Sequence, residues 1–86
     1  MNIDKLQFPI VWQTSIIALG QKPDRKEDII RAFASLALEL SSISRGRSSS
    51  AGHYEAWHIV ANIPDRQRLN AIKKVLTEMP GIKMVL

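Results

Sequence analysis

The stretch HYEAWHIVANI, residues 53–63, decides the fold because its side chains alternate in character. Successive side chains of a strand point to opposite faces, so alternation sorts this stretch into two sets. One set is Trp57, Ile59, Ala61 and Ile63, and the other is Tyr54, Ala56, His58, Val60 and Asn62. The first set is the more apolar, so we expect a long strand that turns this set toward the core.

The residues after this strand have the spacing of a helix. Pro64 ends the strand, and Asp65 is expected to cap the helix by accepting from a free amide of its first turn. The predicted apolar stripe of this helix consists of Leu69, Ile72, Val75, Leu76 and Met79. The segment MPGIKMVL then predicts a Pro-Gly turn and a short final strand.

The N-terminal half has the same order of elements. FPIVWQTSIIAL, residues 8–19, is rich in β-branched and aromatic residues and ends at Gly20, which predicts a strand. Asp24 and Glu27 have the spacing of a capping box, which predicts a helix over Arg25–Leu40. Glu27 and Arg31 have the spacing of a favourable pair on that helix. A weak second strand carrying charged and small polar residues is expected to follow it.

The tripeptide Pro-Asp-Arg opens both expected helices, at residues 23–25 and 64–66. A shared way of starting a helix explains it, and it marks two strand–helix–strand halves. Joined, they give β-α-β-β-α-β, the ferredoxin-like pattern. Right-handed crossovers predict one antiparallel sheet of order 4-1-3-2 with both helices on one face. A chain of 86 residues forms one domain, so we expect a single α+β domain over residues 1–86 with one sheet face open.

Three short pieces stand out by their order and spacing: Phe8-Pro9 before the first strand, SSAGHY at residues 49–54, and MVL at residues 84–86. Together they resemble the YbeD-like family of small, uncharacterised bacterial proteins over nearly the whole chain. The resemblance implies a ferredoxin-like fold similar to regulatory ACT-type domains, and a regulatory or partner-binding role. Ala51 departs from the family, since relatives often carry a basic residue there.

Composition excludes several classes of protein. The chain has no cysteine, which excludes a disulfide framework, a thiolate metal site and a thiol nucleophile. The segment MNIDKLQFPIVWQ lacks the pattern of a secretory leader, and no apolar run approaches the roughly 20 residues of a membrane span. We therefore expect a cytoplasmic domain without membrane contact.

Few residues have the context of a catalytic group. His53 and His58 are expected on opposite faces of an extended segment, which separates them as metal ligands. Asp24 and Asp65 are explained as helix caps. We therefore expect no enzyme, no catalytic residue, no metal and no cofactor.

The open sheet face is the leading candidate site, because a mixed apolar face without a helix over it is where related folds bind a partner. We expect it to serve protein association, including self-association, or small-ligand sensing. The candidate interaction face consists of Gln13, Ser15, Ile17, Ala56, His58, Val60, Lys83 and Val85.

The net charge of +4 keeps a nucleic-acid-binding module open as the alternative. Arg45, Arg47, Ser49 and His53 form a candidate anion contact, and protection of an edge strand is the competing explanation for the arginines. Against the alternative, the third strand lacks the spacing of an RNA-recognition signature. The tryptophans are also expected to face the core, where they cannot stack on bases.

Overall fold

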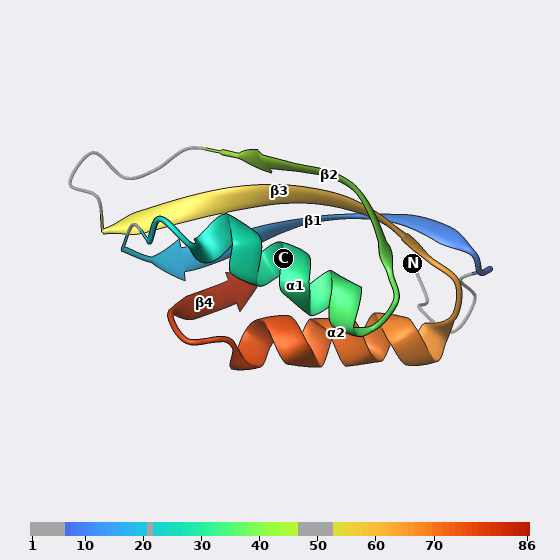
Figure 1. The fold of residues 1–86 in the computed structure, drawn as a ribbon. Helices are drawn as coiled ribbons and strands as arrows, with labels where there is room; N and C mark the ends of the chain where they lie inside the picture. Colours follow the sequence, from blue (N-terminus) through green and yellow to red (C-terminus); the bar gives the residue numbers. More distant parts are fainter. Residues whose placement is uncertain (1–6, 21, 47–52) are drawn as a thin grey trace.

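The computed structural model describes residues 7–20, 22–46 and 53–86, and its elements follow the predicted order (Figure 1). They are β1 (Ile10–Leu19), α1 (Arg25–Ser35), β2 (Glu39–Arg45), β3 (Tyr54–Ile63), α2 (Arg66–Glu78) and β4 (Ile82–Val85). This is the β-α-β-β-α-β arrangement, so the predicted α+β, ferredoxin-like class is confirmed.

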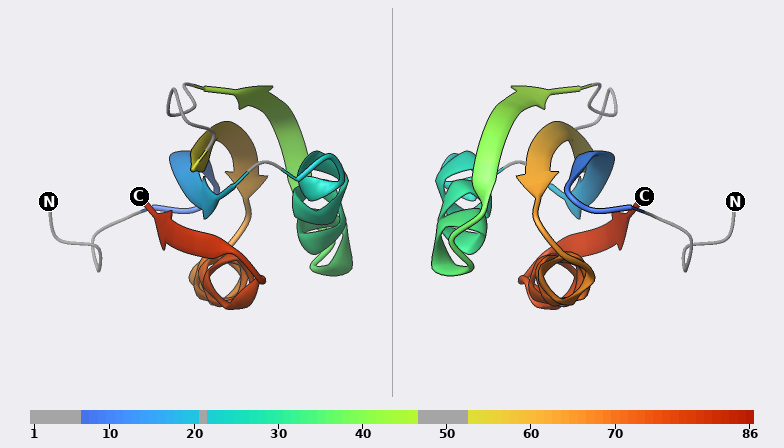
Figure 2. Two further views of the ribbon diagram at one scale, coloured as in Figure 1. Left: turned by 90° about the vertical axis from the view of Figure 1, so that its left-hand side faces the viewer. Right: turned by 90° about the vertical axis from the view of Figure 1, so that its right-hand side faces the viewer.

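The four strands form one antiparallel sheet in the order β2-β3-β1-β4, as predicted. Strands β1 and β3 form its centre and pair along their whole length, from Ile10 opposite Ile63 to Leu19 opposite Tyr54. Figure 2 shows both helices on the same side of the sheet. No described helix covers the opposite side, which we call the open sheet face.

The core lies between the sheet and the helices and contains the predicted inward set of β3. Trp57, Ile59, Ala61 and Ile63 are buried. Ile16 of β1, Phe33 of α1 and Ile72 of α2 pack into the same cluster. The alternation in residues 53–63 therefore predicted the correct side of the sheet for these four residues.

The predicted end of the first helix was wrong. The helix ends at Ser35 rather than Leu40, and Ala37 adopts a left-handed conformation with φ of 54°. The chain then enters β2, where Leu40 pairs with Ala61 of β3 and packs against the core. Tertiary pairing with β3 therefore overrides the helical spacing of this segment.

The two predicted caps differ. Asp65 accepts a hydrogen bond from the amide of Arg68 at 2.8 Å, as expected. Asp24 occupies the N-cap position of α1, as predicted, but its side chain makes no capping hydrogen bond. The carboxylate paired with Arg31 is Asp28, at 3.8 Å, in place of the expected Glu27. Neither of the described helices is long and apolar enough to cross a membrane.

Candidate functional site

The open sheet face is built from the outward side chains of β1 and β3. Because the strands are antiparallel, these side chains face each other in rows across the centre of the sheet. The rows are Val11 with Asn62, Gln13 with Val60, Ser15 with His58, Ile17 with Ala56, and Leu19 with Tyr54. The face therefore contains one polar row, Ser15 with His58, with mixed rows on its Val60 side and more apolar rows on its Ala56 side.

These outward positions carry no Asp, Glu, Lys or Arg, although such residues make up 23% of the chain. His58 contributes the one imidazole among these positions. Among the described residues, the one charged side chain of the two central strands is Glu55, which points inward from β3. The centre of the open sheet face therefore carries no permanent charge.

Ser15 and His58 form a contact across the centre of this face. The Ser15 hydroxyl lies 2.8 Å from His58 Nδ1, and which of them donates depends on the tautomer of the ring. On the other side, Ser44 of β2 pairs with His58, and a side chain at Gly46 would collide with the imidazole. The imidazole thus rests between the central strand β1 and the end of the edge strand β2.

Lys83 lies on the open sheet face, as predicted. Its Nζ donates to the Tyr54 hydroxyl at 3.2 Å and lies 4.6 Å from the centre of the Tyr54 ring. This cation–π contact covers the ring at one end of the face.

The prediction that Val85 points outward was wrong. The pairing of β1 with β4 shifts in register between Ile17 and Ala18, which places Val85 opposite the inward residue Ile16. Val85 consequently packs against the core. Met84, 45% exposed and opposite Ile17, takes its place on the open sheet face.

The candidate anion contact is not assembled by the described residues. Arg45 pairs with the inward residue Trp57, which turns it toward the helix side of the sheet. Its Nη2 lies 3.6 Å from Glu55 Oε2 and its guanidinium 5.1 Å from the centre of the Trp57 ring. His53 accepts a backbone hydrogen bond from Gly20 at 2.6 Å.

Two members of that candidate set, Arg47 and Ser49, lie outside the described residues. Among the described members, Arg45 already contacts a carboxylate and an indole ring. An anion at Arg45 would have to compete with Glu55, so the described part of the set does not favour an anion site.

Sequence reasoning missed a buried ion pair between Arg25 and Glu55. Arg25 Nε lies 2.6 Å from Glu55 Oε1, and the two residues are 4% and 0% exposed. Arg25 also donates through Nη2 to the carbonyl of Leu19 at 3.0 Å. Glu55 lies two residues before Trp57 on β3 and therefore points to the same inward face, so strand alternation could have indicated its burial. Nothing in the sequence indicates that Arg25 is its partner.

The aromatic side chains do not form a platform for stacking bases. Trp12 faces the helices, with its ring centre 6.5 Å from that of Phe33, and Trp57 is buried. Tyr54 is the one aromatic residue among the outward positions of β1 and β3, and Lys83 lies over its ring. Since RNA-recognition modules stack bases on aromatics of these strands, the nucleic-acid alternative is not supported. Within residues 7–20, 22–46 and 53–86 no group of acidic or histidine side chains could hold a metal ion.

Solved structures place this fold in the ACT-like class. The chain superposes on the ACT domain of the GTP pyrophosphokinase from Chlorobium tepidum with a TM-score of 0.71 and 10% identity, over 91% of this chain and 96% of that chain. The regulatory subunit of aspartate kinase from Thermus flavus gives 0.63 and 19%, over 86% of this chain and 48% of that chain. At these identities the likeness shows the fold.

The chain itself belongs to the DUF493 family, described as a protein of unknown function, whose family model matches residues 4–86. This is the YbeD-like family that the sequence resembles. Protein HP0495 from Helicobacter pylori has a similar structure, with a TM-score of 0.74 and 10% identity over 100% of this chain and 94% of that chain. No curated protein matches the chain.

Proposed function

We propose that this protein is a small, non-enzymatic regulatory domain that acts by protein association through its open sheet face. One observation carries the proposal: the outward positions of β1 and β3 hold no Asp, Glu, Lys or Arg. The central part of protein interfaces is depleted of charged residues, whereas nucleic-acid surfaces need Lys and Arg to neutralise phosphates. The uncharged centre of the face therefore suits a protein surface.

The first occupant we propose is a second copy of the same chain. A net charge of +4 opposes self-association in general, and the repulsion is weakest where the centres of the surfaces in contact carry no permanent charge. A two-fold pair buries the same patch on both copies, so one uncharged centre meets the other. The regulatory subunit of aspartate kinase and the ACT domain of GTP pyrophosphokinase share the fold, which agrees with a regulatory role.

A second candidate function is small-ligand sensing on the same face. A hollow of about 410 Å³ lies beside the Ser15–His58 contact, and Gln13, Val60 and Leu86 also line it. Its volume is within the range of small-molecule sites, roughly 300–1,000 Å³. Ser15 and His58 supply polar groups that could orient a ligand there.

Sedimentation across a wide concentration range tests the proposal, with Val60→Glu as the disrupting variant. This variant places a carboxylate beside Gln13 in the uncharged face and should weaken self-association about tenfold or more. Asn70→Glu, at an exposed position of α2, makes the same change in net charge and should associate like the unchanged chain.

Capture of partners from the native cell, with and without nuclease, tests whether another protein or a nucleic acid binds this chain in place of a second copy. Protein partners that resist nuclease and are lost with Val60→Glu support the proposed face. A chain that stays monomeric, and whose sheet-face amides do not shift in cell extract, would contradict it. Partners that disappear with nuclease, or with removal of Arg45 and Arg47, would favour nucleic-acid binding instead.

A further inference from the structure

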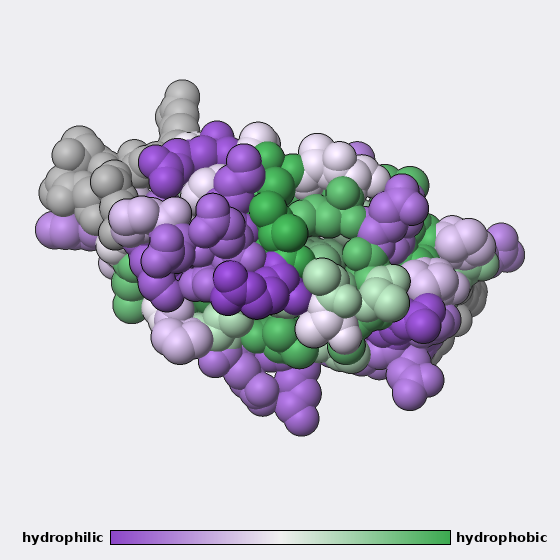
Figure 3. Space-filling model, viewed as in Figure 1, coloured by the Kyte–Doolittle hydropathy of each residue, from purple (hydrophilic) through white to green (hydrophobic). Residues whose placement is uncertain are grey.

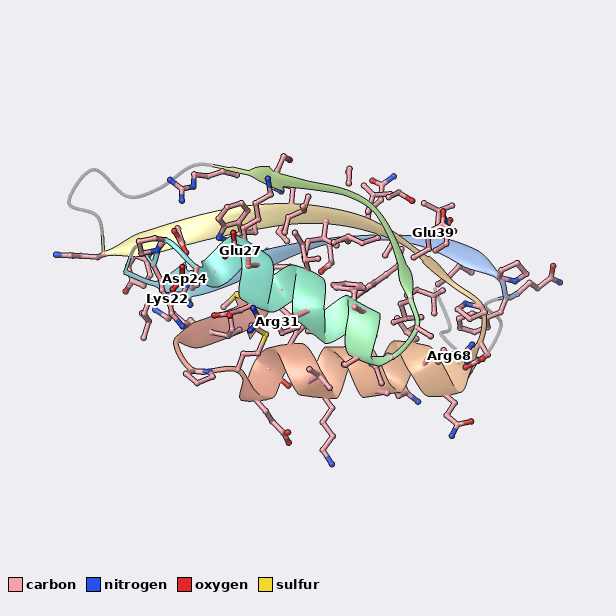
Figure 4. All side chains as sticks on the ribbon, viewed as in Figure 1. Lys22, Asp24, Glu27, Arg31, Glu39 and Arg68 are labelled. Atoms are coloured by element: carbon pink, nitrogen blue, oxygen red, sulfur yellow. The ribbon has the colours of Figure 1, made fainter. Side chains whose placement is uncertain are left out.

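A groove of about 440 Å³ lies on the helix side of the molecule, away from the open sheet face, between α1 and the last turn of α2. Its cationic lining residues are Lys22, Arg25 and Arg31, and its apolar ones include Ala32, Val75 and Met79. Figure 3 shows hydrophilic side chains gathered over the N-terminal part of α1, and Figure 4 shows Lys22 and Arg31 in that region. The groove therefore combines positive charge with an apolar wall.

The rim of the groove carries an excess of positive charge. Asp28 is the carboxylate that lines it, and it faces two cations: Lys22 Nζ at 3.0 Å and Arg31 Nη1 at 3.8 Å. The Lys22 and Arg31 side chains are 49% and 78% exposed, so both can turn toward a ligand. One carboxylate cannot neutralise two cations, which leaves the rim attractive to an anion.

Arg25 supplies a fixed guanidinium on the inner side of the groove, since it is only 4% exposed. Its contacts are Glu55 through Nε, the Leu19 carbonyl through Nη2 and the Pro80 carbonyl through Nη1 at 3.5 Å. A guanidinium has five N–H donors, so these contacts leave donors on both terminal nitrogens. Glu55 also faces Arg45, so its charge is shared between two arginines.

Gly81 makes room for this guanidinium. A Cβ at position 81 would lie 2.9 Å from Arg25 Nη1, and Gly81 has φ of +82°. The first Pro-Asp-Arg tripeptide does more than start a helix. The side chain of Asp24 forms no capping bond, and the neighbouring Arg25 lines the groove. In the second copy, by contrast, Asp65 caps α2.

We propose that this groove binds a small organic anion, with its carboxylate at Lys22 and Arg31 and its apolar body against Ala32, Val75 and Met79. The fixed guanidinium of Arg25 adds positive potential from the inner side. The site lies within one chain and does not depend on the open sheet face, so it stands whether or not the protein self-associates.

Titration followed by amide chemical shifts tests the groove with three probes. They are 3-phenylpropionate, 3-phenylpropylamine, which has the same ring on a cationic chain, and inorganic phosphate, which has charge without an apolar body. We expect 3-phenylpropionate to shift amides around Arg31 and Met79 in a saturable way, with a dissociation constant of roughly 1 mM. The amine should give no saturable shift there, and phosphate should bind more weakly.

Charge removal at the rim gives a matched comparison. Arg31→Gln should weaken 3-phenylpropionate binding about twofold to fivefold, as expected for an exposed ion pair, without unfolding the domain. Lys74→Gln removes the same charge from an exposed position of α2 that does not line the groove and should bind normally. Val60→Glu should also bind normally, which separates this site from the open sheet face.

Several results would overturn the groove proposal. Equal shifts with the amine and the carboxylate would show that charge plays no part. Phosphate binding as tightly as 3-phenylpropionate would remove the role of the apolar wall. Equal weakening by Arg31→Gln and Lys74→Gln, or shifts confined to the open sheet face, would place the ligand elsewhere.

Discussion

Glu55 of β3 and Arg25 in the first turn of α1 meet in the protein interior, with Oε1 2.6 Å from Nε. Neither Arg25 Nε nor the Glu55 oxygens form an aligned hydrogen bond with a described residue, so the contact is an ion pair. Through the Leu19 carbonyl, Arg25 also holds the end of β1. The pair thus joins β1, α1 and β3 at one end of the domain.

Removing the charge of Glu55 should destabilise the fold strongly. Glu55→Gln leaves the buried guanidinium of Arg25 without its counter-charge, and breaking a buried pair in this way costs about 3–5 kcal/mol. Urea unfolding measures the loss. Asp28→Asn, which removes the carboxylate of the exposed pair with Lys22, is the control and should cost less than about 1 kcal/mol.

Replacing both partners should restore most of that loss. An apolar pair such as Arg25→Met with Glu55→Leu leaves no charge in the interior, and such exchanges are often neutral or stabilising. The same urea experiment measures it. The double variant could instead lose as much unfolding free energy as the two single variants combined. In that case other contacts of Arg25, such as the one to the Leu19 carbonyl, stabilise the fold and the ion pair does not.

Gly81 and Gly20 offer a comparison of backbone strain with and without steric crowding. Both have a left-handed φ, +82° and +70°, and alanine in that region costs about 1–2 kcal/mol. At Gly20 a Cβ meets nothing within 4 Å, whereas at Gly81 it would lie 2.9 Å from Arg25 Nη1. Gly81→Ala should therefore lower the unfolding free energy more than Gly20→Ala.

Equal losses at the two glycines would show that the Arg25 side chain moves aside at no cost. Thermal and urea unfolding of both variants measure the difference. A variant with Arg25→Met beside Gly81→Ala removes the crowded guanidinium, so the excess loss at position 81 should shrink in that background.

Sequence periodicity predicted the elements and the burial of β3 because one face of that strand is apolar and a register slip would expose it. It failed where long-range pairing decides the conformation. Leu40 has helical spacing but joins β2 opposite Ala61. The inward position of Val85 depends on the register shift between β1 and β4, which no local pattern marks. The Arg25–Glu55 contact likewise needs the tertiary fold.

The side of the sheet was predicted correctly for the residues of the two central strands, whereas on the edge strand β4 it was correct for Lys83 and wrong for Val85. Ser15, Ile17, Ala56, His58 and Val60 occupy outward positions of β1 and β3, as strand alternation requires. Their role as a site stays a prediction, since alternation determines which side a residue faces and not what it binds. The groove between α1 and α2 had no sequence signal, because its lining residues come from separate segments.

The two Pro-Asp-Arg tripeptides should respond differently to loss of the aspartate. Asp65→Ala removes the hydrogen bond to the Arg68 amide and should destabilise the domain by about 1 kcal/mol. Asp24→Ala removes no capping bond and should cost less than about half of that. Urea unfolding of the two variants side by side measures this; equal costs would contradict the difference in capping.

Gly46 should control the position of the imidazole on the open sheet face. A methyl group at Gly46 collides with His58, and the exposed ring is free to turn away. Gly46→Ala should therefore break the Ser15–His58 contact while costing little stability, about 1 kcal/mol or less, because the displaced side chain is solvent-accessible. Shifts of the His58 ring and Ser15 amide resonances, compared with those of Ser15→Ala, measure the displacement.

If the face associates as proposed, Gly46→Ala should also change the association constant without adding charge, unlike Val60→Glu. The reason is geometric, since the imidazole lies in the polar row between the mixed row of Gln13 and Val60 and the apolar row of Ile17 and Ala56. Unchanged His58 resonances would mean that the backbone at Gly46 yields instead of the ring. Altered resonances with unchanged association would mean that the Ser15–His58 row lies outside the contact area, which would confine the interface to the other rows of the face.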